Sequence, residues 1–160
     1  MQKQSLLDYL IEKTNTLDFD GELEWKWDKK HYAFKLGITL YAVNQNECPI
    51  VDVDEVISVE NIITFYDEIL LFDKIHSFDF NKKDYLVTLS FDGKRGWSQG
   101  KALAFLDTLQ ATLDNGESDL LDFANDESIN VFELKWDVKH FKIETQKNKN
   151  MMTRLPYPKF

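Results

Sequence analysis

The sequence predicts a single α+β domain over residues 1–160, in which helices cover a mostly antiparallel sheet of about five strands. Hydrophobic residues make up 43% of the 160 residues, which is enough for the core of one domain. Period-two alternation of apolar and polar residues, the pattern of half-buried strands, recurs along the chain. Strands and helices do not alternate regularly, as they would in a doubly wound parallel fold.

The first elements are predicted to be a helix and a hairpin. Ser5 and Asp8 have the spacing of a helix-capping box ahead of an apolar run, which predicts a helix over residues 5–16. Residues 23–27 then alternate between apolar and polar, and the alternation resumes over residues 32–40 after a short polar turn. Two such runs joined by a short turn predict an antiparallel pair of strands.

The middle of the chain combines a loop with further strands. Residues 44–49 have the composition of a loop. From there to residue 61, β-branched residues are interleaved with acids, and this pattern suits an edge strand or an ordered loop. Residues 62–72 are expected to form a strand, bent near its centre. Residues 84–91 alternate again and predict another strand.

Two central helices are expected next, one on each side of Gly116. A turn at residues 93–96 leads into a helix that is capped near Ser98 and has leucines along one face. Asn115 and Gly116 form a suitable C-terminal stop. Ser118 can then cap a second, shorter helix.

The C-terminal part is predicted to contain a strand, a helix and a tail. Residues 130–136 alternate as a strand would, and Asp137 can cap a helix that runs to about Lys149. Residues 150–160 form a basic tail with two prolines, which favour an extended chain. We expect this tail to dock on its own domain.

The charge distribution argues against direct binding of nucleic acid. The chain has 28 acidic residues against 19 lysines and arginines, and 18 against 6 between residues 47 and 127. Phosphates attract basic surfaces instead. No apolar run is long enough to span a membrane, and a single cysteine excludes an intrachain disulfide. These features favour a cytoplasmic protein without nucleic-acid or membrane partners, and they leave the oligomeric state open.

Two segments of nine residues, beginning at Glu24 and Glu133, are identical at six positions. Each carries an aspartate three residues before a histidine, in the pairs Asp28–His31 and Asp137–His140. A histidine oriented by a carboxylate can act as a general base near neutral pH. The alternative, which we favour, is that each aspartate ends a strand or caps a helix beside a solvated histidine. No partner is predicted for His76.

Other candidate site residues lie near the last helices. Lys94 and Arg95 precede a predicted helix N-terminus, where an anion could bind, although a plain turn with two solvated bases is the commoner arrangement. Tyr157 and Phe160 in the tail could dock on this domain or on another protein. The acids at positions 52, 54 and 55 lack a metal-binding motif, so neither a metal ion nor a cofactor is expected.

Several segments resemble a known family. They are residues 27–30, 69–72, 116–123, 132–137 and 157–160. In matching order, they resemble domain of unknown function 3013, an uncharacterised family of Firmicute bacteria that is common in lactic-acid bacteria. The resemblance spans nearly the whole chain and implies a bacterial cytoplasmic protein. It implies no activity and transfers no catalytic residue.

The sequence leaves three functions open. We favour a non-enzymatic accessory domain that binds another protein through an aromatic and acidic surface, because no nucleophile, metal or phosphate motif is present. The first alternative is a metal- or histidine-dependent hydrolase of a small substrate, which would require carboxylates and histidines to converge in one apolar-walled cleft. The second is mimicry of nucleic-acid charge, which would require rows of acids on one face.

Overall fold

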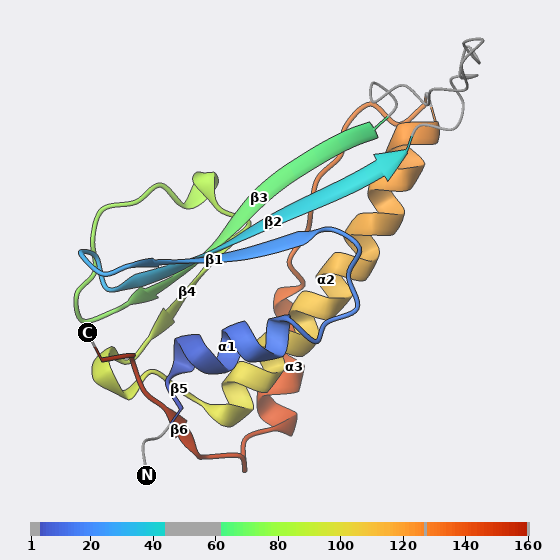
Figure 1. Cartoon of the computed structure of the whole chain (residues 1–160). Coiled ribbons are helices and arrows are strands. Elements are labelled where there is room, and N and C mark those ends of the chain that lie inside the picture. Colours follow the sequence, from blue (N-terminus) through green and yellow to red (C-terminus); the bar gives the residue numbers. More distant parts are fainter. Residues whose placement is uncertain (1–3, 44–61, 127, 160) are drawn as a thin grey trace.

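A computed structural model describes residues 4–43, 62–126 and 128–159, and it confirms the α+β class (Figure 1). The elements, in chain order, are α1 (Leu6–Thr14), β1 (Glu22–Asp28), β2 (Ala33–Val43), β3 (Ile62–Asp73), η2 (Lys82–Asp84), β4 (Val87–Phe91), η3 (Gly93–Arg95), β5 (Trp97–Ser98), α2 (Gln99–Asn125), α3 (Val138–Lys147) and β6 (Arg154–Leu155). Figure 1 shows α1 and α2 on one face of the main sheet and α3 beside α2. None of the helices in these residues has the length and apolar character needed to cross a membrane.

The main sheet has four strands in the order β1-β2-β3-β4, and it is mixed rather than antiparallel throughout. The β1–β2 and β2–β3 pairs are antiparallel as expected, whereas β4 runs parallel to β3, with Ile69 opposite Val87. β5 and β6 form a separate antiparallel pair. Side-chain alternation reports burial and not strand direction, so the direction of β4 could not be predicted from its alternation.

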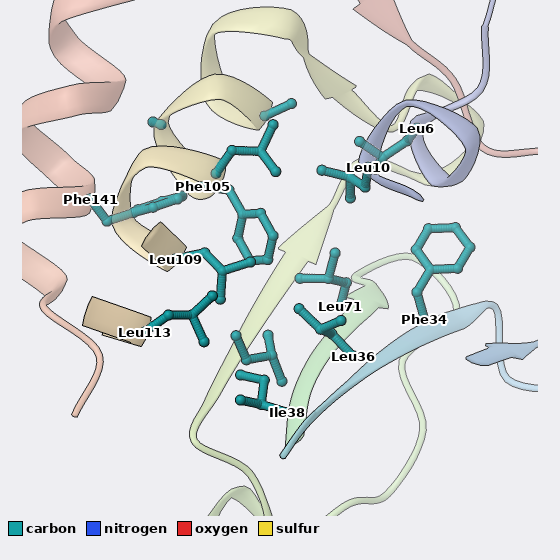
Figure 2. Close-up of a cluster of buried hydrophobic side chains, with 14 of the residues drawn as sticks. Leu6, Leu10, Phe34, Leu36, Ile38, Leu71, Phe105, Leu109, Leu113 and Phe141 are labelled. Carbon is teal, nitrogen blue, oxygen red and sulfur yellow. The ribbon is translucent and has the colours of Figure 1, made fainter. Parts of the chain in front are cut away.

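The core lies between the inner face of this sheet and the helices (Figure 2). Residues of β2 and β3 pack there against apolar side chains of α1, α2 and α3. Those labelled in Figure 2 are Leu6, Leu10, Phe34, Leu36, Ile38, Leu71, Phe105, Leu109, Leu113 and Phe141. Burying each large apolar side chain stabilises the fold by about 1.5–3 kcal/mol.

The expected division into two central helices is wrong, because α2 continues through Gly116 to Asn125. A Cβ atom at Gly116 would lie 2.5 Å from Cδ1 of Leu134, so glycine here allows close packing rather than ending the helix. The expected cap is confirmed: the Ser98 hydroxyl accepts a hydrogen bond from the Lys101 amide at 3.2 Å.

The strand expected at residues 130–136 is absent, since this segment has no paired neighbour in the described part of the chain. Its alternating side chains are nevertheless buried or half-buried. The ring of Phe132 lies edge-on to Phe65 at 4.7 Å, and Leu134 is 7% exposed. The cap expected at Asp137 is confirmed, because its side chain accepts a hydrogen bond from the His140 amide at the start of α3.

The C-terminal segment is held against the rest of the domain. The carbonyl of Pro156 accepts a hydrogen bond from the Leu6 amide at 2.8 Å, and the amide of Tyr157 donates to the carbonyl of Lys94 at 3.0 Å. Leu155 in β6 is buried. These contacts join the tail, the start of α1 and the turn before β5. Phe160 and the segment 44–61, with its acids at positions 52, 54 and 55, lie outside the described residues.

Candidate functional site

A pocket of about 1160 Å³ opens where the β1–β2 turn, the start of α1 and the C-terminal segment meet. Its walls include three aromatic side chains, Trp27, Tyr32 and Tyr157. Its lining also includes the charged residues Asp8, Asp73, Lys94 and Lys159 and the histidine His76. Aromatic walls and charged groups therefore share one cleft, which is the ordinary composition of a binding pocket.

A buried aspartate positions a histidine in this pocket. Asp73 ends β3 and is 2% exposed. Its Oδ2 lies 2.6 Å from Nδ1 of His76, while its Oδ1 accepts hydrogen bonds from the amides of Ile75 and Gly93 at 2.8 and 3.0 Å. The His76 side chain is 51% exposed. Because the carboxylate holds Nδ1, Nε2 is the nitrogen that remains to accept a proton.

Tyr32 places its ring against this histidine. Its φ angle of 52° lies in the left-handed region, which is uncommon for a bulky residue. The ring stacks on His76 with a centroid distance of 4.2 Å and an interplanar angle of 19°, and the Tyr32 carbonyl accepts a hydrogen bond from the Asp73 amide. Strained backbone of this kind concentrates at functional sites.

Tyr157 forms a fixed wall of the pocket. Its hydroxyl accepts a hydrogen bond from Nε1 of Trp27 at 2.7 Å, and its ring stacks on Phe34 and Phe91 at 5.5 and 5.7 Å. Burial raises the pKa of Tyr157 above its ordinary value of 10.0, although the hydrogen bond from Trp27 opposes the rise. The phenol therefore stays neutral at physiological pH.

The candidate pair Asp28–His31 forms, although the arrangement favoured from the sequence was a solvated histidine, and it lies outside the residues that line the pocket. Oδ2 of Asp28 lies 2.7 Å from Nδ1 of His31, whose ring stacks on Phe78 at 4.5 Å. Burial alone would raise the pKa of Asp28, but the hydrogen bonds from His31 outweigh it and lower the pKa. This pair belongs to the β1–β2 turn.

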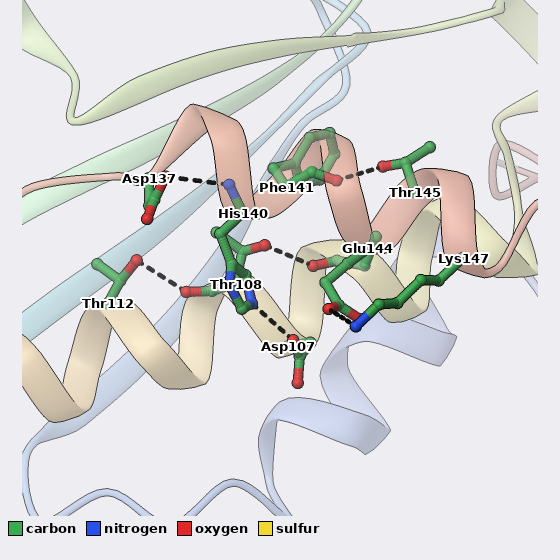
Figure 3. Close-up of polar contacts among 10 residues, drawn as sticks. Asp107, Thr108, Thr112, Asp137, His140, Phe141, Glu144, Thr145 and Lys147 are labelled. Atoms are coloured by element: carbon green, nitrogen blue, oxygen red, sulfur yellow. Dashed lines mark hydrogen bonds and ion pairs between the residues drawn. The ribbon is translucent and has the colours of Figure 1, made fainter.

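The second candidate pair, Asp137–His140, does not form between side chains, and Asp137 caps α3 as the favoured alternative expected. Asp137 accepts a hydrogen bond from the backbone amide of His140, while Nε2 of that histidine lies 2.7 Å from Oδ2 of Asp107 on α2 (Figure 3). The two repeated segments thus share the Asp-x-x-His backbone contact and not the side-chain pairing. Trp27 contacts Tyr157, whereas Trp136 contacts Phe105 and Phe141, so their tryptophans also pack differently.

The structure separates the remaining predicted residues. Lys94 and Tyr157 line the pocket together. Arg95 uses its backbone carbonyl to accept a hydrogen bond from Nε of Arg154 at 3.2 Å and does not line the pocket. Residues Gly93–Arg95 form a single 3-10 turn before β5 rather than the first turn of α2. Phe160 lies outside the described residues.

Of the predicted site residues, only Lys94 and Tyr157 line the pocket, and the residues missed there include Tyr32, Asp73 and His76. The spacing of Asp73 and His76 is the same as that of Asp28 and His31, so the Asp-x-x-His pattern occurs three times in the chain. This repeated spacing was the available signal. The left-handed backbone of Tyr32 has no signature in the sequence, because tyrosine is not a residue that favours it.

Comparisons with known proteins give a family without an assigned activity. The family described as "Protein of unknown function (DUF3013)" matches residues 1–159. A solved structure, described as a conserved protein of unknown function from Enterococcus faecalis, is 32% identical with a TM-score of 0.84, and the match covers 99% of this chain and 98% of that one. No curated protein matches. The chain therefore belongs to the DUF3013 family, as its sequence resemblance predicted.

Proposed function

We propose that this protein is a non-enzymatic accessory domain that binds a short acidic segment of another protein in the pocket beside His76. The observation that carries the proposal is the convergence of three aromatic walls with the cations of Lys94 and Lys159 in one cleft. Tyrosine and tryptophan provide large contact areas, and they are enriched among the residues that dominate the energetics of protein interfaces.

The size of the pocket suits a peptide. Its volume of about 1160 Å³ slightly exceeds the range of about 300–1,000 Å³ that is typical of small-molecule sites. Several residues of an extended segment could occupy it. The hydrogen bond between Trp27 and Tyr157 fixes one wall in advance, which reduces the entropy lost on binding.

Charge favours an acidic segment. Lys94, Lys159 and His76 line the pocket together with Asp8 and Asp73. The carboxylate of Asp73 is already occupied by two backbone amides and the His76 imidazole, so it repels an incoming anion less than an unpaired carboxylate would. A chain with a net charge of −9 thus places two lysines in one cleft, where they can pair with carboxylates of an acidic segment, and complementary charge of this kind gives specificity and faster association.

Peptide selection tests the proposal. Random peptides displayed on phage are selected on the full-length protein, and we expect enrichment of sequences that place Asp or Glu beside an aromatic residue. The charge reversal Lys94→Glu should weaken binding of these peptides at least tenfold. Lys139→Glu, a matched reversal at an exposed position of α3, should leave it unchanged. Equal loss in both variants, or no enrichment, would reject the proposal.

A specific observation also favours histidine-dependent hydrolysis of a small substrate. The Asp73–His76 pair has the orientation that a general base needs, with Nδ1 held by a buried carboxylate. Nε2 could then take a proton from a water molecule as it attacks a bound ester. Turnover of a panel of small esters that is lost in His76→Ala and kept in His31→Ala would support this function over binding alone.

Mimicry of nucleic-acid charge has less support from the described surface. On the outer face of the sheet, Glu24 and Glu68 flank Gly37 in register, but Lys26 and Lys35 form the neighbouring pair. Acids and bases therefore share this face. A phosphate-like row would need acids without interleaved lysines.

A further inference from the structure

Three potential metal ligands meet between α2 and α3, away from the pocket. They are Asp107 on α2 and His140 and Glu144 on α3, and one donor atom from each lies within 4.8 Å of the other two (Figure 3). One imidazole and two carboxylates form a mixed nitrogen and oxygen donor set, which differs from a simple cluster of acids. The chain separation of 33 residues between Asp107 and His140 hides this set from a motif search.

The backbone of α3 places two of the three side chains on one face. His140 and Glu144 are four residues apart, so they project from the same face of α3. The Asp137 cap holds the start of that helix at the His140 amide, and the buried Phe141 packs on Trp136 at 5.8 Å. The two helices therefore present the donors from firmly packed elements.

The three donor atoms lie close enough together to be rearranged around one ion. Nε2 of His140 lies 2.7 Å from Oδ2 of Asp107. Ligands about 2.0–2.1 Å from a tetrahedral Zn²⁺ lie about 3.4 Å apart, so small side-chain rotations would fit the three donors around an ion. The Glu144 carboxylate pairs with Nζ of Lys147 at 3.2 Å, and since the lysine side chain is exposed, it can move into solvent when the carboxylate binds a metal ion.

We propose that Asp107, His140 and Glu144 bind a divalent transition-metal ion of the Zn²⁺ type, which joins α2 to α3. Imidazole suits Zn²⁺, Ni²⁺ and Cu²⁺, whereas Mg²⁺ and Ca²⁺ prefer sites made only of oxygen donors. Three protein ligands leave a coordination position for water or another ligand. The sequence contains no metal motif, so no metal ion was expected from it. Asp107 comes close to His140 and Glu144 only through the packing of the two helices, which the sequence does not show.

Calorimetric titration of the metal-free full-length protein with Zn²⁺ tests the proposal. We expect one tight-binding ion per chain. Asp107→Asn should weaken binding at least tenfold, because its amide oxygen can still accept the His140 hydrogen bond but is a poor metal ligand. Glu144→Gln should have a similar effect. His31→Gln is the matched control, since His31 also pairs with one carboxylate but, among the residues that the structure describes, belongs to no group of three donors, and it should bind as the wild type does.

A second readout separates specific from adventitious binding. Zn²⁺ should raise the melting temperature of the wild type and of His31→Gln, but not that of Asp107→Asn or Glu144→Gln, because only an ion bound by the native state stabilises it. Zn²⁺ binding of equal strength in the wild type and both carboxylate variants would overturn the proposal. So would a loss of binding in His31→Gln, or no binding at all.

Discussion

Tyr157 offers the sharpest test of how the C-terminal segment contributes to the fold. Its ring contacts Trp27, Tyr32, Phe34 and Phe91, with centroid distances between 5.5 and 5.9 Å. We expect Tyr157→Ala to lower the free energy of unfolding because it removes this ring from the aromatic cluster. Tyr157→Phe keeps the ring and removes only the hydroxyl.

The contacts set the expected magnitudes. Losing the hydroxyl leaves Nε1 of Trp27 without this acceptor, which costs about 1–2 kcal/mol. Losing the whole side chain also removes a burial term of about 1.5–3 kcal/mol and aromatic pairings of about 0.5–1.5 kcal/mol each. Since the ring is only partly buried, we expect a total near 3 kcal/mol for the alanine variant.

Urea denaturation measures both variants. The midpoint should fall in the order wild type, Tyr157→Phe, Tyr157→Ala, with an unchanged slope. Tyr41→Ala is the control, because Tyr41 is 43% exposed on β2, and it should cost clearly less than Tyr157→Ala, at about 1 kcal/mol or below. A loss below about 1 kcal/mol for Tyr157→Ala would show that the C-terminal segment adds little to the fold, and the reasoning from its contacts would be refuted.

Three other positions give measurable outcomes. Gly116→Leu should cost at least about 2 kcal/mol in a urea melt, because even a Cβ atom there lies 2.5 Å from Leu134, and an unchanged midpoint would contradict the packing described. Trp136→Ala should cost about 2–4 kcal/mol through its contact with Phe105, whereas a cost below about 1 kcal/mol would remove residues 130–136 from the core. Burial raises the pKa of Asp67 above its ordinary value of 3.8, so the carboxyl group stays protonated to higher pH in the native state than in the unfolded state. The native state therefore loses stability as the pH rises through the raised pKa. Asp67→Asn, which cannot ionise, should therefore be at least as stable as the wild type at pH 7, and the difference in stability should disappear below pH 3.8. Urea melts across this pH range measure the difference, and a variant that is less stable at pH 7 than at low pH, relative to the wild type, would contradict the prediction.

Local signals predicted the elements whose ends depend on side chains close in the sequence. The caps at Ser98 and Asp137 belong to this class, because each accepts a hydrogen bond from an amide three residues away. The alternation of β1 and β2 likewise predicted their pairing, since a hairpin is a local structure.

Tertiary packing decided the elements that the sequence mispredicted. Gly116 carries a local stop signal, but α2 continues through it because a residue without a Cβ lets the helix approach Leu134 and Leu40. Residues 130–136 alternate because Phe132, Leu134 and Trp136 face the core, and burial of alternate residues does not require a paired strand. Periodicity therefore reported which side chains are buried and not which backbones pair.

The candidate sites depended even more on long-range contacts. The Asp-x-x-His spacing was visible at Asp28 and Asp137, but the histidine that lies in a pocket follows Asp73. Nothing in the spacing distinguishes the three. Only the position of Asp73 at the end of β3, where the Gly93 amide also reaches it, buries this carboxylate beside the pocket.

The indole resonances of the four tryptophans test the proposed peptide site most directly. Trp27 lines the pocket and its Nε1 donates to Tyr157, whereas Trp97 is 2% exposed and its Nε1 donates to the Ser90 carbonyl. When a selected acidic peptide is titrated into ¹⁵N-labelled protein, the Trp27 indole signal should shift in a saturable way while the Trp97 signal stays in place. A saturable shift elsewhere in the spectrum with an unmoved Trp27 signal would contradict a binding site in this pocket.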